Sequence, residues 1–238
     1  MLSRPPQQFA SFAARYQPLV YDLTDAGRQV LSEAGQLDRY APPRTDHFLH
    51  RIMGASISAS VELLARERGI AFIPTEHILS HPKCPESTRS SPNPLAIPIP
   101  GVLGSLIPDN LFGFRYPGDG YRFFAVEIDR NSESIERKTS TQNAFAKKVR
   151  GYHELFRSRA FESHWGVPNL LVLTVTTNST HMFNILRYLT NLADPLSERF
   201  LFKAEPVFGV NWRVMRETLA HLFTPWERTG TPFDISKP

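Results

Sequence analysis

The sequence contains a single cysteine, Cys84, and this scarcity limits both the chemistry and the compartment of the protein. One thiol cannot form an internal disulfide, and it cannot supply a structural zinc site built from cysteine ligands. Long apolar runs are also missing, because no stretch approaches the roughly 20 residues that span a bilayer. The N-terminus lacks the apolar centre of a signal peptide. We therefore expect a cytoplasmic protein without a membrane partner.

A strong excess of charge of one sign is absent as well. The chain has 27 Lys and Arg against 23 Asp and Glu, a mildly basic balance that permits a polyanionic partner without requiring one. At 238 residues, with 41% hydrophobic and 11% aromatic content, it is long enough to bury a full core. We expect one sizeable domain over residues 41–238, preceded by a separate N-terminal segment over residues 1–40.

Hydrophobic periodicity predicts alternating helices and strands in the larger domain. A helix is expected from Thr45 or Asp46 to about Arg68, because its apolar residues recur at the spacing of a face packed on a sheet. Residues 169–176 are continuously apolar or β-branched, which is typical of a central buried strand. The pattern predicts an α/β fold, a mixed sheet flanked by helices. The other expected elements are a strand at 69–74, a long irregular proline-rich loop at 80–105, a helix from Ser140 or Thr141 to about Phe161, a helix at 180–193, a strand at 199–204 and a last helix at 212–223.

Residues 106–129 predict two strands joined by a tight turn, and the rest of the chain is organised around them. The turn signal is Pro-Gly-Asp-Gly at 117–120, between aromatic and β-branched runs. In the second strand the period of two places Glu127 and Asp129 on the same face. Folding about the turn brings Asp109, at the start of the first strand, level with residues 127–129, and a one-residue change in the loop decides which of the two acids lies opposite it.

Three carboxylates in this arrangement need a compensating charge. Cross-strand neighbours have Cβ atoms roughly 4.5–5.5 Å apart, so the acids must either raise a pKa or share a cation. Clustered oxygen ligands suit Mg²⁺ or Mn²⁺. The alternative is an ordinary surface hairpin with solvated, well-separated acids, although both strands are otherwise strongly apolar. The candidate metal ligands are Asp109, Glu127, Asp129 and, from the preceding helix, Glu62.

The segment before residue 40 resembles the end of a winged-helix DNA-binding domain. A short extended piece is followed by a helix with Thr24 or Asp25 as its N-cap. The pattern Tyr-x-Leu-Thr-x-x-Gly-x-x-x-Leu, which begins at Tyr21, resembles the last strand and following helix of such domains. No recognition helix is visible before it. We expect either a winged-helix remnant or a plain structural strand and helix.

The larger domain resembles the PD-(D/E)XK nuclease superfamily, with its restriction-endonuclease-like core of a helix, a three-stranded meander, a helix and another strand. Pro108-Asp109 is followed 18 residues later by Glu127-Ile128-Asp129 on the next strand, and the resemblance covers roughly residues 45–178. More narrowly, the chain resembles the plasmid-associated replication-relaxation family, in which a winged-helix segment precedes a nuclease-like domain. The residues that carry this second resemblance are Leu23-Thr24-x-x-Gly27, His50, Ile107-Pro108-Asp109, Val126-Glu127-Ile128-Asp129-Arg130 and Lys148-x-x-x-Tyr152.

The resemblance implies a catalytic set, with one departure from the pattern. In the superfamily the Asp and the Glu hold one or two divalent ions, and a lysine two residues after the Glu helps to position the attacking water. Asp129 stands where that lysine belongs. The lysine role has therefore either moved or been lost. Some superfamily members carry a relocated lysine on the following helix, which makes Lys148 the best candidate, followed by Lys147 and Lys138. The implied catalytic residues are Asp109, Glu127, Asp129 and Lys148, with Mg²⁺ or Mn²⁺ as cofactor.

Basic residues near the acids are candidate contacts for a DNA backbone. The helix expected at 140–161 is distinctly basic. Lys83 and Arg89 lie in the proline-rich loop, where they either touch phosphates or are simply solvated. Phosphate contacts of this kind are salt-dependent and largely independent of sequence. The candidate DNA-binding residues are Lys147, Arg150, Arg157, Lys83 and Arg89.

Two functions follow from these expectations. The first is a Mg²⁺-dependent DNA endonuclease of a mobile element. The alternative is a non-catalytic DNA-binding accessory factor for plasmid replication or transfer that keeps the nuclease fold. Retention of Asp109 and Glu127 favours the first function, whereas Asp129 in the lysine position favours the second. DNA is the expected partner in both cases, and a second copy of the chain and replication or transfer proteins are further candidate partners.

Overall fold

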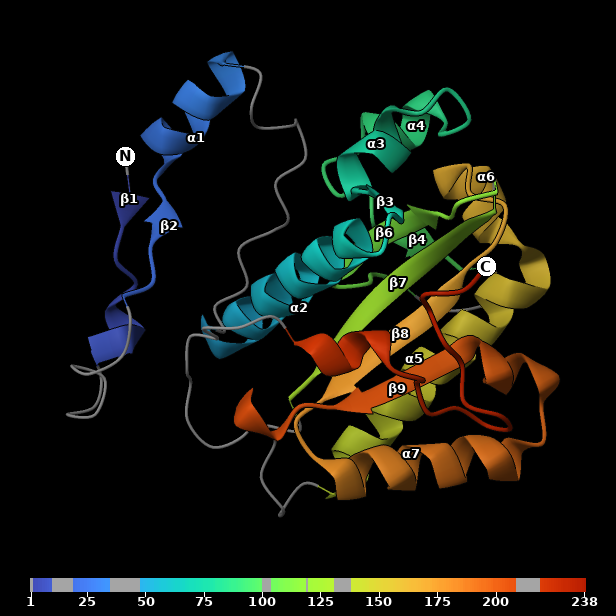
Figure 1. Ribbon diagram of the computed structural model, residues 1–238. Coiled ribbons are helices and arrows are strands. Elements are labelled where there is room, and N and C mark those ends of the chain that lie inside the picture. Colours follow the sequence, from blue (N-terminus) through green and yellow to red (C-terminus); the bar gives the residue numbers. More distant parts are fainter. Residues whose placement is uncertain are drawn as a thin grey trace.

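The computed structural model describes residues 2–9, 19–34, 48–99, 104–118, 120–130, 138–208 and 219–238. Its centre is a five-stranded sheet in the order β3-β6-β7-β8-β9 (Figure 1). The neighbours β3-β6 and β6-β7 are antiparallel, whereas β7-β8 and β8-β9 are parallel, so the expected mixed sheet is confirmed. The strands are β3 (Ala71–Ile73), β6 (Asn110–Arg115), β7 (Tyr121–Asp129), β8 (Leu171–Thr176) and β9 (Phe200–Ala204).

Helices cover both faces of the sheet, and the alternation of side chains along β7 explains why. Phe123 and Ala125 pack in a core with α5 (Lys138–Ser158) and α7 (Ser179–Leu192). Phe124, Val126 and Ile128 pack on the opposite face with α2 (Phe48–Glu67). Because both faces of β7 are covered by apolar cores, the strand is buried along most of its length. Among the described residues no helix has both the length and the apolar character needed to cross a membrane.

The predicted hairpin is present, and its register decides which of the two acids lies opposite Asp109. Asn110 is paired with Val126, and the backbone N–H of Asp109 donates to the Val126 carbonyl at 2.9 Å. Asp109 therefore lies at the level of Glu127, directly before the start of β6. Gly118 adopts a φ of +92° in the turn, a conformation that favours glycine.

Residues 80–99 and 104–105, the described part of the expected irregular loop at 80–105, differ from that expectation. They contain α4 (Glu86–Arg89) and the strands β4 (Ile97–Pro98) and β5 (Ser105–Leu106), which pair with each other. Cys84, Leu95 and Ile97 are fully buried in the core under the sheet. Apolar residues spaced among the prolines hold the segment against the domain, and proline content alone did not reveal this.

Two predicted helices also differ from expectation. The helix expected to reach Phe161 ends at Ser158, where Arg159 takes a φ of +52°, and continues as the short helix α6 (Ala160–Trp165). The helix expected at 212–223 lies largely outside the described residues, and its described end is a 3-10 turn, η6 (Ala220–Phe223). The remaining elements are β1 (Leu2–Ser3), η1 (Pro6–Phe9), β2 (Asp22–Leu23), α1 (Asp25–Glu33), α3 (Thr75–Ser80), η4 (Pro195–Arg199) and η5 (Pro206–Phe208).

The N-terminal segment is a small unit of its own beside α2 (Figure 1). β1 and β2 form a two-stranded antiparallel sheet, and α1 begins directly after β2. The Thr24 hydroxyl accepts the backbone N–H of Gly27 at 3.1 Å, so Thr24 is the N-cap that the sequence offered as one of two choices. The Arg51 guanidinium of α2 pairs with Asp22 of β2 and ties the segment to the domain.

Candidate functional site

The candidate site is centred on Glu127, near the end of β7. This carboxylate is buried, with only 4% of the residue exposed. The hydroxyl of Tyr152 donates to its Oε1 at 2.6 Å, and the Nζ of Lys148 donates to its Oε2 and forms an ion pair with it. Lys148 and Tyr152 are four residues apart on α5 and thus lie on the same helix face. The basic helix therefore presents two donors to one buried acid.

Burial and neighbouring charges together raise the pKa values of Glu127, Lys148 and Tyr152. Removal from water raises the pKa of Glu127, Lys148 opposes that effect, and the carboxylate of Asp109 adds to it. Burial would lower the pKa of Lys148, but the attraction of Glu127 and of Asp109 outweighs it and the pKa is raised. The pKa of Tyr152 is raised by burial and by Glu127. Lys148 and Tyr152 therefore stay protonated at neutral pH and act as donors.

Asp109 lies directly before the start of β6 and reaches toward the opposite face of the sheet. Its Oδ2 accepts the backbone N–H of Ile128 at 2.7 Å, and its Oδ1 is 3.1 Å from the Nε2 of His50 on α2. Asp109 and Glu127 thus make their hydrogen bonds on different sides of the strand. The two carboxylates still act on each other, since Asp109 raises the pKa of Glu127. Asp109 is the link between the two faces.

Asp129 shares the face of Glu127 but has a different partner. Its Oδ2 is 2.7 Å from the Nε2 of His181, in the first turn of α7. Asp129 also attracts Lys148, so three carboxylates act on one ammonium group. In this arrangement the cation that compensates the acids is a lysine.

Two cavities adjoin these residues. The first, about 190 Å³, lies between the sheet, α5 and α7, and is lined by Glu127, Asp129, Lys148, Tyr152 and His181 among others. The second, about 460 Å³, lies on the other side of β7, where α2 and the N-terminal segment meet the sheet. Asp109 and His50 line the second cavity and not the first.

The structure does not bring Glu62 to the other acids. It pairs with Arg66, one turn further along α2. Glu62 lies twelve residues beyond His50, about 18 Å along the helix axis at 1.5 Å per residue. Within the described ranges, no cluster of three or more His, Cys, Asp or Glu side chains has the arrangement of a metal site. We therefore leave Glu62 out of the candidate site.

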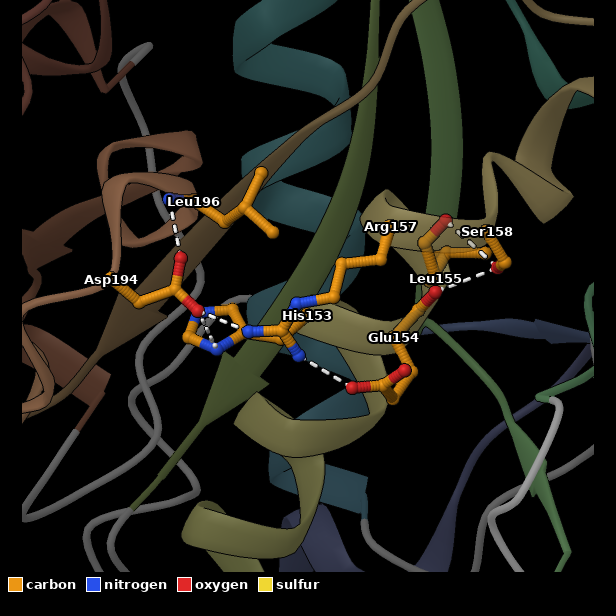
Figure 2. A network of polar contacts seen from close by, with 7 residues as sticks. All are labelled: His153, Glu154, Leu155, Arg157, Ser158, Asp194 and Leu196. Atoms are coloured by element: carbon orange, nitrogen blue, oxygen red, sulfur yellow. Dashed lines mark hydrogen bonds and ion pairs between the residues drawn. The ribbon is translucent and has the colours of Figure 1, made fainter.

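The basic residues predicted on α5 fall into two groups. Lys147 and Arg150 are exposed on the same helix as Lys148. Arg157 instead belongs to a network at the other end of the helix, where it pairs with Glu154 and with Asp194 of the segment after α7 (Figure 2). The buried His153 faces the same Asp194 carboxylate at 3.4 Å. Arg157 therefore fastens α5 to the α7–β9 connection.

Lys83 and Arg89 lie far from the acids. The backbone of Lys83 packs so closely on Gly166, after α6, that a Cβ there would meet its carbonyl group at 2.5 Å. Arg89 pairs with Glu86 within α4. Asn169, close to Gly166 in sequence, donates to the Tyr121 carbonyl at the start of β7, whereas Glu127 is six residues along that strand, about 20 Å away. These two basic residues lie near the opposite end of the sheet.

Sequence reasoning named the acids and Lys148 but gave no role to two of their partners. Tyr152 was visible as the fourth residue after Lys148, a spacing that puts both on one helix face. His181 had no such signal, because only the packing of α7 against the sheet brings it to Asp129.

The fold and the site define a mixed α/β protein with a buried acid held by a lysine and a tyrosine of one helix. A family model with the description Replication-relaxation matches residues 1–171, and the chain belongs to this family. Membership indicates a role in replication or in the processing of mobile-element DNA. No curated protein matches the chain. No solved structure matches it.

Proposed function

We propose that this protein is a divalent-metal-dependent DNA endonuclease of PD-(D/E)XK type that serves a mobile element. The observation that supports this most is the contact between Lys148 and Glu127. The superfamily pattern needs a lysine beside the acid, and Asp129 occupies the usual position. A lysine delivered from the following helix meets the requirement by another route.

The order of elements supports a restriction-endonuclease-like core. α2 is followed by the antiparallel strands β3, β6 and β7, then by α5 and by β8 parallel to β7. With α3, α4, β4 and β5 inserted between β3 and β6, and α6 inserted before β8, this order is consistent with a helix, three antiparallel strands, a helix and another strand. The strand and helix formed by β2 and α1 are consistent with a winged-helix remnant, although they are equally a plain structural unit.

The donor chemistry of the site fits Mg²⁺ or Mn²⁺. Asp109 and Glu127 are the residues that would hold the ion, since both offer carboxylate oxygens and since Asp109 is near enough to raise the pKa of Glu127. Mg²⁺ is usually bound by one or two carboxylates together with waters and substrate phosphates, so a third protein acid is not required. When bound, the ion would supply neutralisation of phosphate charge and activation of water.

The chain's own residues would complete the chemistry. Lys148 remains charged because its pKa is raised, so it acts as an electrostatic stabiliser of the reacting phosphate and not as a general base. Tyr152 donates to Glu127 and keeps that carboxylate in place from the buried side. Lys147 and Arg150, exposed near Lys148, would hold the flanking phosphates.

A supercoiled-plasmid nicking assay tests the proposal. With Mg²⁺ present we expect cleavage by the native chain, and its loss in Asp109→Ala and in Glu127→Gln. Glu62→Gln is the matched control, because Glu62 is an acid of the same domain outside the site, and it should cleave normally. Cleavage that persists in both site variants would contradict the proposed catalytic role.

A non-catalytic accessory factor is the second candidate, and one observation favours it. Both oxygens of Glu127 already have donors, from Tyr152 and Lys148, as in a purely structural ion pair. The discriminating result is gel-shift binding of DNA without cleavage under the same Mg²⁺ conditions. Failure of both binding and cleavage at low salt would contradict both functions.

A further inference from the structure

We infer that the second cavity, between α2 and the N-terminal segment, receives one unpaired base of the DNA strand whose phosphate is processed at Asp109 and Glu127. The inference rests on the proposed function, because it takes DNA as the substrate. It adds the form of that substrate, which is a strand with at least one unpaired nucleotide beside the reacting phosphate.

The position of the cavity is the first reason. Asp109 lines it, so the cavity opens directly at one of the two candidate catalytic carboxylates. The N-terminal segment and the domain both contribute to the wall of the cavity, and all the residues that line it lie within the part of the chain matched by the family model.

The size of the cavity excludes a double helix. A volume of about 460 Å³ is in the range of small-molecule sites, which suits a base with part of its sugar. Enzymes that do chemistry on a base bind a single extruded nucleotide in a pocket, which shows that a site of this kind can hold one base. The cavity therefore selects single-stranded or locally opened DNA.

The charge of the cavity favours a neutral base over a phosphate. Of the described residues that line it, two are arginines and three are carboxylic acids: Arg28 and Arg51, and Asp22, Glu76 and Asp109. Both guanidinium groups face Asp22, with Arg28 at 3.8 Å from its carboxylate. A surplus of carboxylates repels an anion but can accept hydrogen bonds from the N–H groups of a base.

The floor of the cavity is rigid and still has free hydrogen-bonding capacity. Asn110 is fixed there, because its Nδ2 donates to the Ser58 hydroxyl at 3.0 Å and its Oδ1 accepts the Thr75 hydroxyl at 2.9 Å and the Leu111 N–H at 2.8 Å. Ser58 keeps its own proton for a ligand. Within the part of the chain that the structure describes, no hydrogen bond or ion pair engages the Glu76 carboxylate.

The rim offers an aromatic surface for the base. Tyr21 lines the cavity and is 51% exposed. Base–aromatic stacking tolerates every base, so a pocket of this kind binds single strands without strict sequence preference. The hydrogen-bonding floor then limits the orientation of the base.

Ala55→Phe is the variant that tests the inference. Ala55 lines the cavity but is exposed on α2, so a phenyl group there fills the cavity without disturbing the core. Ala59→Phe, exposed one turn further along the same helix and outside the cavity lining, is the matched control. Affinities are measured by fluorescence anisotropy with a labelled oligonucleotide, single-stranded or as a blunt duplex, in EDTA so that no cleavage occurs.

Ala55→Phe should weaken single-strand binding about tenfold, the cost of losing one stacked base. It should leave duplex binding unchanged, and Ala59→Phe should change neither. A 2-aminopurine base in the oligonucleotide should change its emission on binding to the native chain and not to Ala55→Phe. Equal single-strand affinity in the two Phe variants, or an equal loss for single strand and duplex, would overturn the inference.

The binding measurement is separable from the nicking assay. If the native chain binds single strands more tightly than Ala55→Phe but does not nick DNA, the nuclease proposal is contradicted and the base-binding cavity is supported. If the native chain nicks DNA but Ala55→Phe binds single strands as tightly as the native chain does, the base-binding role of the cavity is contradicted and the nuclease proposal is supported.

Discussion

Lys148 is the residue whose expected role differs most between the two candidate functions. As an electrostatic stabiliser it would act on the reacting phosphate, whereas as a backbone contact it would act on the bound strand. Its ammonium group is held on Glu127 and attracted by two further acids, Asp109 and Asp129, which fixes its position before DNA binds. A preorganised charge of this kind contributes to the transition state without a cost of reorganisation.

We expect Lys148→Ala to lower the nicking rate about 10²-fold or more, as removal of one preorganised donor does, while DNA affinity changes little. Lys147→Ala removes the same charge from the neighbouring exposed position and should affect affinity more than rate. Single-turnover nicking and anisotropy binding separate the two effects. If Lys148→Ala lowers DNA affinity but not the nicking rate, Lys148 is a phosphate contact and not an electrostatic stabiliser.

Tyr152 is expected to matter for stability as well as for the site. Tyr152→Phe keeps the ring in the core but leaves Oε1 of a buried carboxylate without its donor. Hydrogen bonds to charged groups contribute about 1.5–3 kcal/mol, so the free energy of unfolding should fall by about that amount. Urea unfolding measures it. Tyr121→Phe, at an exposed position of the same sheet, should have almost no effect, and equal losses in both variants would refute this account.

At the scale of elements, the close pairing of β6 with β7 depends on a glycine. A Cβ on Gly113 would lie 2.7 Å from the Phe123 ring, which is buried in the core with α5. The hairpin thus accepts the aromatic ring because the facing strand has no side chain there. This contact holds β7 in the position from which Glu127 meets α5.

Gly113→Ala should lower the free energy of unfolding by about 1–3 kcal/mol, the usual cost of overpacking a core. Gly54→Ala on α2 is the contrasting variant, because its Cβ would meet Ile128 at an ordinary 3.9 Å. Alanine is favoured over glycine inside a helix by about 1 kcal/mol, so Gly54→Ala should be neutral or stabilising. Thermal unfolding of the two variants checks the difference in sign, and a tolerated Gly113→Ala would mean that the strands can separate at this point.

At the scale of the whole molecule, one buried and two half-buried histidines contribute to the response to acid. Burial lowers the pKa of His153, which lies in the network that joins α5 to the α7–β9 connection (Figure 2), and it also lowers the pKa of His164 and of His221. In the unfolded chain a histidine binds a proton near its ordinary pKa of about 6.5. The unfolded state therefore takes up more protons than the folded state as the pH falls below that value.

The free energy of unfolding should consequently be highest above pH 6.5 and fall as the pH drops through the window between the unfolded and the lowered folded pKa values. Urea midpoints measured across this range give the slope. His153→Gln should flatten part of the slope, whereas His77→Gln, at an exposed position, should not. A native chain whose stability rises on acidification through this window would contradict the assignment.

The sequence by itself determined the local architecture of this protein. The period of two placed Glu127 and Asp129 on one face, and the turn at 117–120 set the level of Asp109. The apolar repeat of α2 predicted a helix packed on a sheet. These features depend on neighbours along the chain or across one hairpin, so short-range pattern contains them. The burial of Cys84, Leu95 and Ile97 in the proline-rich segment did not follow, because the apolar residues there have no period.

Only the tertiary structure decided how the acids are compensated. In the tertiary structure the carboxylate of Asp109 contacts His50 on one side of the sheet. The carboxylate of Glu127 contacts Lys148 and Tyr152 on the other side. The tertiary structure also brought His181 to Asp129 and left Glu62 with Arg66. The physical reason is that these contacts depend on how whole helices dock on the sheet, which is set by the shape of two buried cores and by no local spacing of residues.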